Sequence, residues 1–347
     1  MKLRNRTVTA LASSALATVL VVGLGGFGLT SASATSPLKK GQTFYLIPKD
    51  TLNPYETLED GGIKAALQSL GDKAVISSGT VDTAAAQIPS IQAAIQAHAA
   101  GIVIAGNDPS ALCPSLAQAR AAGLVVVSAD SDITCPNHLF INQANTQQIG
   151  TSEVDLLAKE IGNSGQIAIL SAAATATNQN SWIRYMKTEL KKYPKMKLVT
   201  TVYGNDDPAT SLTVLQGLLS AYPNLRGIIS PTTVGISTAA QYLDTHRSLL
   251  KHVTLTGLGL PSQMKKYVLD GTVKEFELWN PINLGRLAGY AVANLASGSI
   301  KIQAGQKFTA PGLGTYTILP ASGTTGPSVV LGPPFVFTKA NVAKFNF

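Results

Sequence analysis

Polar side chains stand directly after several short apolar runs of this chain, and their types suit hydrogen bonding to a small polar ligand. The clearest examples are Lys49, Asn107, Asp108, Asp130, Asn178 and Gln179. Carboxylates, amides and an ammonium group donate and accept at adjacent hydroxyls, and the charge-assisted bonds are the stronger ones. The rings of Tyr55 and Trp279 are suited to cover the apolar face of a sugar-like ring. This mixture favours recognition of a neutral, hydroxyl-bearing ligand.

Catalytic and metal-binding chemistry has less support. The sequence holds no G-x-S-x-G, Walker or H-E-x-x-H motif, and no G-x-G-x-x-G follows its first apolar run. Asp130 and Asp132 form a D-x-D pair that could hold a hard cation, but a lone pair of this kind is weak evidence. The four histidines have no obvious Ser or Cys partner, and the two cysteines offer no metal-ligand spacing. We expect no catalytic residue, no cofactor and no metal.

Helix capping is the competing explanation for polar residues at strand ends. Asp108 precedes Pro109, a favourable cap followed by proline, and Asn178 could cap its own helix. Lys49 resists this explanation because a long cation is a poor turn residue. Trp182 falls within an expected helix and is interpreted as a core residue.

The elements that would position these residues alternate between strand and helix in two successive runs. The first run comprises expected strands at 43–48, 74–77, 102–105 and 125–128, with helices at 61–70, 83–100 and 109–122. The second comprises expected strands at 166–170, 198–203, 227–230 and 253–257, with helices at 146–161, 178–192, 208–221, 234–244 and 261–270. Such alternation indicates βαβ units with parallel pairing, and near-continuous apolar strands indicate sheets covered on both faces. The expected fold class is α/β, with two doubly wound parallel-sheet domains that divide near 142–145.

The remainder of the chain returns to shorter elements. We expect a strand at 272–279 and an apolar helix at 282–295. The Gly- and Pro-rich tail at 308–347 carries short strands near 316–319 and 328–331. It has too many apolar residues to be disordered, so we expect it to pack on the second domain.

The first 34 residues read as an export signal. Lys2, Arg4 and Arg6 precede a mostly apolar stretch, and Ala32 and Ala34 satisfy the small-x-small rule for cleavage before Thr35. An uncleaved membrane anchor is the alternative, since the stretch is long. No cysteine follows it, which excludes a lipoprotein anchor. Removing the three basic residues lowers the formal net charge from +8 to +5, a scattered excess that does not favour nucleic acid.

Cys113 and Cys135 are the only cysteines of the chain. Two cysteines in an exported protein favour one disulfide, and closing a loop of roughly 22 residues would stabilise the fold by about 3 kcal/mol. Two buried free thiols are the alternative.

Several segments together resemble those of a known family. They are FYLIPK (44–49), NPY (53–55), ALCPSL (111–116), DSD (130–132), INQAN (141–145), ATNQNSW (176–182), IISPTTVG (228–235), GTVKEFELWNP (271–281) and the F-x-F of Phe345 and Phe347. In this order they resemble the sugar-type periplasmic binding proteins of ABC importers. The similarity is greatest to the rhamnose-binding and autoinducer-2-binding branch, and it covers essentially the whole chain after the signal.

The resemblance implies two lobes joined by three crossovers, with a ligand in the cleft between them that drives hinge closure. We expect the signal at 1–34, the first lobe at 40–143 with 280–307, and the second lobe at 144–279 with 308–347. The pairing of Cys113 with Cys135 also fits the family.

The autoinducer-2 contacts of that branch correspond to Lys49, Asp130, Asn178, Gln179, Pro231 and Thr233. Asn178 stands where that branch has an Asp, and Thr233 where it has an Ala. Both differences favour L-rhamnose or a related deoxy sugar over autoinducer-2. The full expected set of ligand-binding residues is Lys49, Tyr55, Asn107, Asp130, Asn178, Gln179, Pro231, Thr233, Trp279 and Asn280.

The expected function is capture of a monosaccharide for an ABC importer, by a monomer in the periplasm or at the cell exterior. Its expected partners are the sugar and the permease subunits in the membrane, with no nucleic acid. An autoinducer-2 receptor and a secreted sugar-modifying enzyme are the alternatives. A sugar-responsive repressor would need a DNA-binding helix-turn-helix before residue 43, where the export signal stands instead.

Overall fold

Parallel strands buried on both faces organise the fold. The computed structural model describes residues 37–322 and 326–347, so the expected export signal lies outside the described residues. Strands β3 (Gly101–Ile104) and β5 (Leu139–Asn142) are buried at every position. Such strands require helices on both faces of their sheet.

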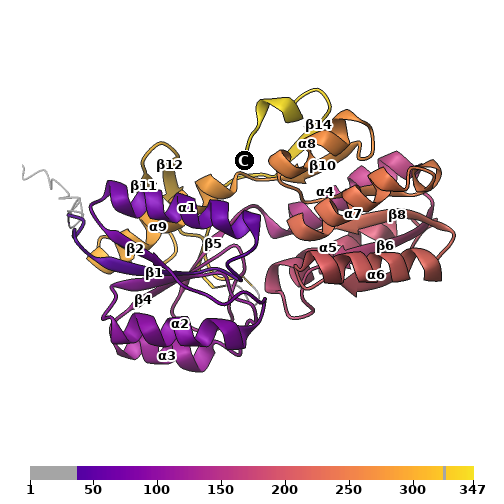
Figure 1. Cartoon of the computed structure of the whole chain (residues 1–347). Helices are drawn as coiled ribbons and strands as arrows, with labels where there is room; N and C mark the ends of the chain where they lie inside the picture. The colour runs from indigo at the N-terminus through magenta and orange to yellow at the C-terminus, as the bar shows by residue number, and fades with distance from the viewer. Residues whose placement is uncertain (1–36, 323–325) are drawn as a thin grey trace, which may run out of the picture. The chain divides into compact units, whose positions relative to one another are not determined.

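The first sheet runs in the order β13-β5-β4-β3-β1-β2, and every neighbouring pair is parallel. The remaining strands are β1 (Thr43–Ile47), β2 (Lys73–Ile76), β4 (Val125–Ala129) and β13 (Ser328–Val330). Its helices are α1 (Pro54–Ser69), α2 (Ala84–Gln96), α3 (Cys113–Ala121) and α9 (Pro281–Ser297). Figure 1 shows α1 and α9 over one face of this sheet and α2 and α3 over the other. We refer to this sheet with its helices as the first lobe.

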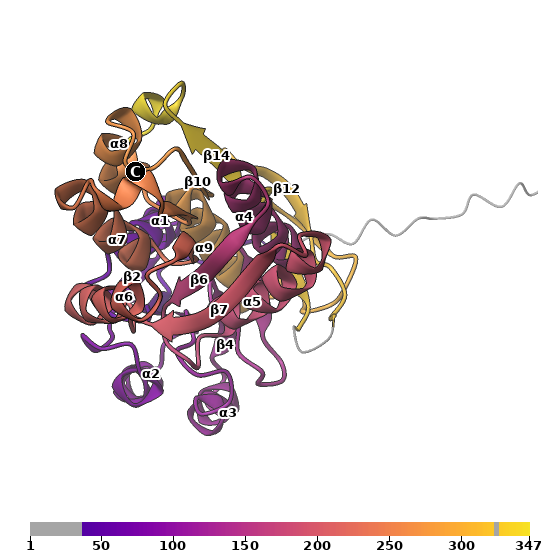
Figure 2. The ribbon, with the colours of Figure 1, turned by 90° about the vertical axis from the view of Figure 1, so that its right-hand side faces the viewer.

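The second sheet runs in the order β7-β6-β8-β9 and is also parallel throughout. Its strands are β6 (Gly165–Ser171), β7 (Met196–Tyr203), β8 (Leu225–Ser230) and β9 (Thr254–Gly257). Its helices are α4 (Thr146–Ile161), α5 (Thr177–Glu189), α6 (Pro208–Ala221), α7 (Thr233–Thr245) and α8 (Pro261–Leu269), with short 3-10 turns at Leu190–Lys192 and Leu249–Lys251. Figure 2 looks onto this second lobe, where β6 and β7 lie side by side. The two parallel sheets confirm the expected α/β class.

The tail of the chain contributes to both lobes. Strand β14 (Phe335–Thr338) pairs antiparallel with β10 (Glu275–Leu278) beside the second sheet, ahead of a 3-10 turn at Val342–Lys344. β13, in contrast, pairs with β5 at the edge of the first sheet. The antiparallel hairpin of β11 (Lys307–Ala310) and β12 (Gly314–Thr317) contacts α9 of the first lobe. The expectation that 308–347 packs wholly on the second lobe is therefore wrong for β11, β12 and β13, because these strands find their partners in the first.

The described chain passes between the lobes at three places. It leaves the first lobe between β5 and α4, and it returns between β10 and α9. It crosses again between β13, on the first sheet, and β14, on β10. These passages match the three crossovers that the resemblance implies.

Capping side chains fix where several helices begin. Asn53, Asp207 and Asn280 each precede a proline and accept a backbone N–H bond from the first turn of α1, α6 and α9. The helix expected from Pro109 begins instead at Cys113. The Oδ1 of Asp108 accepts bonds from the N–H groups of Ser110 and Ala111, which holds the intervening residues in a turn.

Helices α1 and α9 approach closely because glycines face each other along their seam. A Cβ on Gly62 would lie 2.2 Å from the carbonyl oxygen of Ile282, and one on Gly285 would lie 1.9 Å from that of Glu59. No helix within 37–322 and 326–347 is both long and apolar enough to cross a membrane.

Candidate functional site

The polar residues singled out from the sequence meet where the strands of both sheets end. Lys49 follows β1 and Asp130 follows β4 in the first lobe. Asn178 stands in the first turn of α5, directly after the loop that leaves β6 in the second lobe. This is the edge at which open parallel sheets bind ligands.

Lys49, Asp130 and Asn178 form a closed network across the two lobes. Asn178 Nδ2 donates to Asp130 Oδ2 at 2.8 Å, and Lys49 Nζ donates to Asn178 Oδ1 at 3.3 Å. Lys49 Nζ also lies 3.6 Å from Asp130 Oδ2. The three residues are 2%, 3% and 7% exposed, so their charges interact with little screening from water.

Aromatic rings extend this network on one side. The hydroxyl of Tyr55 donates to Asp130 Oδ1 at 3.1 Å and accepts from Trp279 Nε1 at 2.6 Å. The rings of Tyr55 and Trp279 are edge to face with centroids 6.3 Å apart, and Trp182 lies 5.8 Å from Trp279. Trp182, interpreted from the sequence as core, therefore belongs to this aromatic group as well.

These residues surround a pocket. Its lining consists of Lys49, Asn53, Tyr55, Glu56, Asp130, Asn178, Gln179, Trp182, Asp206, Pro231, Thr232, Thr233, Leu258, Leu278 and Trp279. Eight of the ten residues predicted to bind ligand are in this lining.

Asn107 and Asn280 are the two predicted residues outside the lining. Asn107 Nδ2 donates to the carbonyl oxygen of Lys49 at 2.7 Å and to that of Thr83 at 3.2 Å, so it braces the loop that carries Lys49. Asn280 Oδ1 accepts from the N–H of Asn283 at 3.2 Å and caps α9. Capping is the role of Asn280, whereas the Nδ2 of Asn107 braces a loop and its buried Oδ1 has no hydrogen-bond partner among the described residues.

The sequence reasoning missed several lining residues. Asp206 accepts a hydrogen bond from Thr232 Oγ1 and follows the end of β7, so the strand-end rule could have found it. The sequence gave no indication that Leu258 and Leu278 line a pocket, because each continues an apolar run that is typical of core residues. Asn53 and Glu56 belong to the beginning of α1, where polar residues are ordinary helix-start residues.

The electrostatics of the pocket are set by one cation among several carboxyl groups. Burial acts to lower the pKa of the Lys49 ammonium, but nearby carboxyls, Asp130 foremost, outweigh burial and the net pKa is raised. Burial raises the pKa of Asp130, against the opposing effects of Lys49 and of hydrogen bonds from Tyr55 and Asn178. Burial and Asp130 raise the pKa of Glu56 well above its usual range. Lys49 is thus held charged, and it is the only basic residue among the described lining residues.

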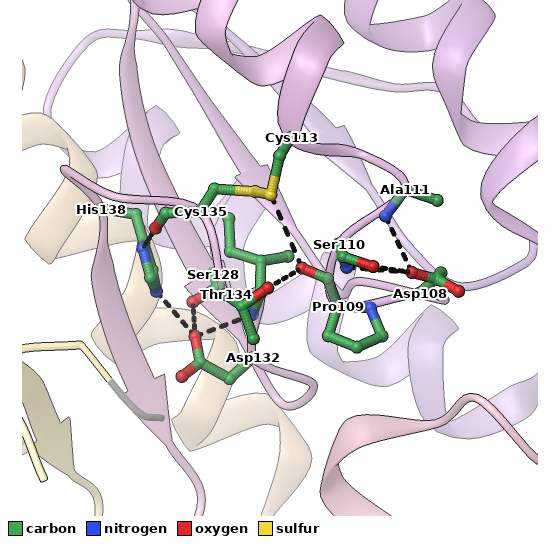
Figure 3. The surroundings of a disulfide bond; sticks show 11 residues. Asp108, Pro109, Ser110, Ala111, Cys113, Ser128, Asp132, Thr134, Cys135 and His138 are labelled. Carbon is green, nitrogen blue, oxygen red and sulfur yellow. Dashed lines mark hydrogen bonds and ion pairs between the residues drawn. A yellow bond between two sulfur atoms is a disulfide. The ribbon is translucent and has the colours of Figure 1, made fainter. Parts of the chain in front are cut away.

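A second network fixes the loop that carries Asp130 (Figure 3). Cys113 and Cys135 form a disulfide with their Cα atoms 5.2 Å apart, which confirms the expected pairing. His138 Nδ1 lies 2.6 Å from the carbonyl oxygen of Cys135, and its Nε2 lies 2.7 Å from Asp132 Oδ1. The same Asp132 oxygen accepts from Ser128 Oγ at 2.7 Å.

The two carboxylates of the D-x-D segment therefore serve different partners. Asp130 faces the pocket, whereas Asp132 binds Ser128 and His138 beneath the disulfide. No group of three or more His, Cys, Asp or Glu residues is arranged around a metal position in the described part of the chain.

The arrangement of the sheets matches that of known proteins. Residues 44–300 match the family model described as the periplasmic binding protein domain. An ABC transporter solute-binding protein from Clostridium phytofermentas with bound L-rhamnose is 40% identical, with a TM-score of 0.86 over 88% of this chain and 98% of that one. A sugar ABC transporter structure from Actinomyces odontolyticus is 43% identical, with a TM-score of 0.69 over the same shares.

A more distant structure shares the same fold. LsrB from Clostridium saccharobutylicum in complex with AI-2 is 27% identical, with a TM-score of 0.81 over 88% of this chain and 100% of that one. The family model spans most of the described chain, and two solved relatives reach 40% identity or more over almost their whole length. The chain therefore belongs to the periplasmic binding protein family, among the solute-binding proteins of ABC transporters.

Proposed function

We propose that this protein captures a neutral monosaccharide, L-rhamnose or a related deoxy sugar, and delivers it to the permease subunits of an ABC importer. The observation that carries the proposal is the buried network of Lys49, Asp130 and Asn178 between the ends of the two sheets. A sugar hydroxyl can donate to the Asp130 carboxylate while a neighbouring oxygen accepts from Lys49. An anionic ligand would meet more carboxyls than the single lysine could pair.

Two further features support a hydroxyl-bearing ligand. Gln179 Oε1 lies buried at the pocket and has no hydrogen-bond partner among the described residues, so a ligand hydroxyl could satisfy it. The rings of Trp182 and Trp279 offer apolar faces for the C–H groups of a sugar ring. The L-rhamnose-bound relative, at 40% identity, points to the same class of ligand.

Ligand capture would proceed by closure of the two lobes. The first lobe comprises 40–143 with 280–307, together with β11, β12 and β13. The second comprises 144–279 and the rest of the tail. A ligand can shift the open and closed populations only through contacts that differ between them. Asp130 and Lys49 on one lobe, with Asn178 and Gln179 on the other, provide such contacts.

Autoinducer-2 is the second candidate ligand, because LsrB carries AI-2 in the same fold. Asn178 weighs against it. A carboxylate at this position would lie against Asp130 Oδ2, where the amide now donates a hydrogen bond at 2.8 Å. A sugar-modifying enzyme has less support still, since the sequence carries no G-x-S-x-G, Walker or H-E-x-x-H motif and the side chains around Asp130 form a binding network. We propose that the protein has no enzymatic activity.

We further propose that residues 1–34 are an export signal cleaved before Thr35. The mature protein would then act outside the cytoplasm as a monomer. Titration calorimetry of the purified exported protein against a panel of monosaccharides and autoinducer-2 tests the proposed function. We expect one deoxy sugar to bind with micromolar or tighter affinity, about −8 kcal/mol or better. Absence of binding by every sugar in the panel would refute the proposed function, and binding of autoinducer-2 alone would favour the second candidate.

A further inference from the structure

The lining of the pocket includes three aliphatic side chains that cannot form hydrogen bonds. The polar side chains of its lining belong to Lys49, Asn53, Tyr55, Glu56, Asp130, Asn178, Gln179, Asp206, Thr232, Thr233 and Trp279. The aliphatic lining comes from the second lobe alone, from Pro231, Leu258 and Leu278. The two leucines are 2% and 1% exposed, so they are core residues that also face the pocket.

Backbone pairing places Leu258 beside the strand that carries Leu278 and occupies several main-chain groups around them. Leu258 follows β9 and bridges in parallel to Glu277, the neighbour of Leu278 in β10. The N–H of Leu258 donates to the carbonyl oxygen of Ser230 at 3.0 Å, and the N–H of Gly259 donates to that of Glu277 at 3.1 Å. These main-chain groups are therefore already paired within the protein.

The indole beside the leucines is also paired. Trp279 Nε1 donates to the hydroxyl of Tyr55 at 2.6 Å, and that hydroxyl donates in turn to Asp130. A ligand hydroxyl placed against Leu258 and Leu278 would lose its hydrogen bonds to water and gain none from these neighbours. An unpaired buried hydroxyl is costly, whereas a buried methyl group is favourable.

We propose that Leu258 and Leu278 form a methyl-binding subsite that receives the exocyclic methyl group of a 6-deoxyhexose. This inference rests on the proposed function and names the substrate class within it. The site would hold the ring hydroxyls at Lys49, Asp130 and Asn178 and direct carbon 6 toward the leucines. It therefore selects 6-deoxy sugars against the matching sugars that carry a hydroxyl at carbon 6.

A matched pair of sugars tests the subsite on the unmodified protein. L-Rhamnose and L-mannose differ only in the hydroxyl at carbon 6, and L-fucose and L-galactose form a second such pair. We expect the 6-deoxy member to bind roughly 10- to 100-fold more tightly, the range that apolar pockets achieve against an added hydroxyl. Equal affinity within the pair that binds would overturn the subsite and leave the proposed function standing. Absence of binding by all four sugars, with none bound from the wider panel, would overturn the proposed function itself.

Substitution then locates the selectivity. Leu258→Ala and Leu278→Ala each remove part of the apolar wall, so the ratio of the two affinities should shrink several-fold toward one. Leu269, the last residue of α8, is 41% exposed and is absent from the pocket lining. Leu269→Ala is therefore the control and should leave the ratio of the two affinities unchanged. Circular dichroism melts identify the variants that are folded. If Leu258→Ala and Leu278→Ala are folded and the ratio of the two sugar affinities is unchanged, the selectivity lies elsewhere and the subsite is refuted. If neither variant folds, the sugar pair measured on the unmodified protein decides the matter.

Discussion

Asp130 and Asn178 meet across the pocket, with 2.8 Å between the Oδ2 of the first and the Nδ2 of the second. Asp130 belongs to the end of a strand in the first sheet, and Asn178 to a helix of the second lobe. The amide is oriented by Lys49, whose Nζ donates to its oxygen at 3.3 Å. One neutral side chain thus connects the carboxylate and the ammonium group of the opposite lobe.

Removing the charge of Asp130 should weaken sugar binding strongly. We expect Asp130→Asn to cost about 2–4 kcal/mol, or about 30- to 900-fold in Kd, because Lys49 would lose its buried partner. Asn is the informative substitution because Asp130 has φ 56°, a left-handed conformation that Asn adopts readily. Calorimetry with the preferred sugar measures the loss. Asp108→Asn, at an exposed turn, is the control, and near-normal affinity of Asp130→Asn would remove this carboxylate from the site.

Introducing a carboxylate at position 178 should make stability depend on pH. Asn178→Asp places a second buried acid against Asp130 Oδ2, so the pKa of the new group would be raised by burial and by the like charge. A raised acid pKa in the folded state gives stability that is present at low pH and lost as pH rises through that value. The melting temperature of the variant, relative to the natural protein, should be lower at pH 8 than at pH 5. An equal offset at both values would show that the two side chains do not interact.

Glu277 provides a built-in pH dependence. Burial raises the pKa of its carboxyl to about 8, despite the hydrogen bond that Ser152 donates to it at 2.6 Å. The fully buried Glu153 nearby also has its pKa raised well above the usual range, by burial and by Glu277. The folded protein therefore binds more protons than the unfolded chain between the ordinary value of 4.5 and about 8. Stability from Glu277 is complete below pH 4.5 and falls as pH rises through 8.

Replacing this carboxyl with an amide tests that relationship. Glu277→Gln should raise the melting temperature at pH 9 by roughly 2–4 °C and flatten its decline between pH 6 and 9. Glu275→Gln, in the same strand but paired with exposed Lys159, is the matched control and should change the pH profile little. A decline in Glu277→Gln as steep as that of the natural protein would assign the pH dependence to other groups.

The disulfide should stabilise the whole protein. Replacing Cys113 and Cys135 with Ser opens a loop of 22 residues and should lower the free energy of unfolding by about 3 kcal/mol. Denaturant unfolding of the double variant measures the change. Reductant should lower the stability of the natural protein by a similar amount and leave the variant unaffected, whereas equal stabilities would show that the bridge does not constrain the unfolded chain.

The seam between α1 and α9 should tolerate no side chain at Gly285. A Cβ there would meet the carbonyl oxygen of Glu59 at 1.9 Å, so Gly285→Ala should destabilise by about 1–3 kcal/mol. Gly217, also in a helix, has no atom near its Cβ position, and Gly217→Ala should stabilise by about 0.5–1 kcal/mol. Opposite shifts in melting temperature are expected, and a shared direction would contradict the close approach.

The sequence predicted the site best where a general rule of parallel sheets applied. Lys49, Asp130 and Asn178 were found because polar residues after buried strands meet at one edge of the sheet. The same rule also selected Asn107, which lies outside the pocket lining and whose amide N–H braces a neighbouring backbone. Leu258 and Leu278 could not be found, because a leucine that lines a pocket and one that fills a core follow the same apolar pattern.

The repeated strand–helix units were predictable, and so were short strands in the tail, but the partners of the tail strands were not. β13 has three residues in a Gly- and Pro-rich segment, and nothing local distinguishes β5 from the second sheet as its partner. β5 itself was not expected, because it has only three apolar residues, which run directly into a polar cluster, and no helix precedes it. Both strands form because they pair with strands that are distant in the sequence or come from another unit of the sheet.

The position of β13 and β14 near the end of the sequence affects how the protein gains its stability. The first sheet lacks its edge strand until residues 328–330 are present, and β10 lacks its partner until residues 335–338 are present. Each lobe is thus completed by a segment that follows the other lobe in the sequence. Heat or denaturant should accordingly melt both lobes in a single cooperative transition, and the first 143 residues alone should not fold.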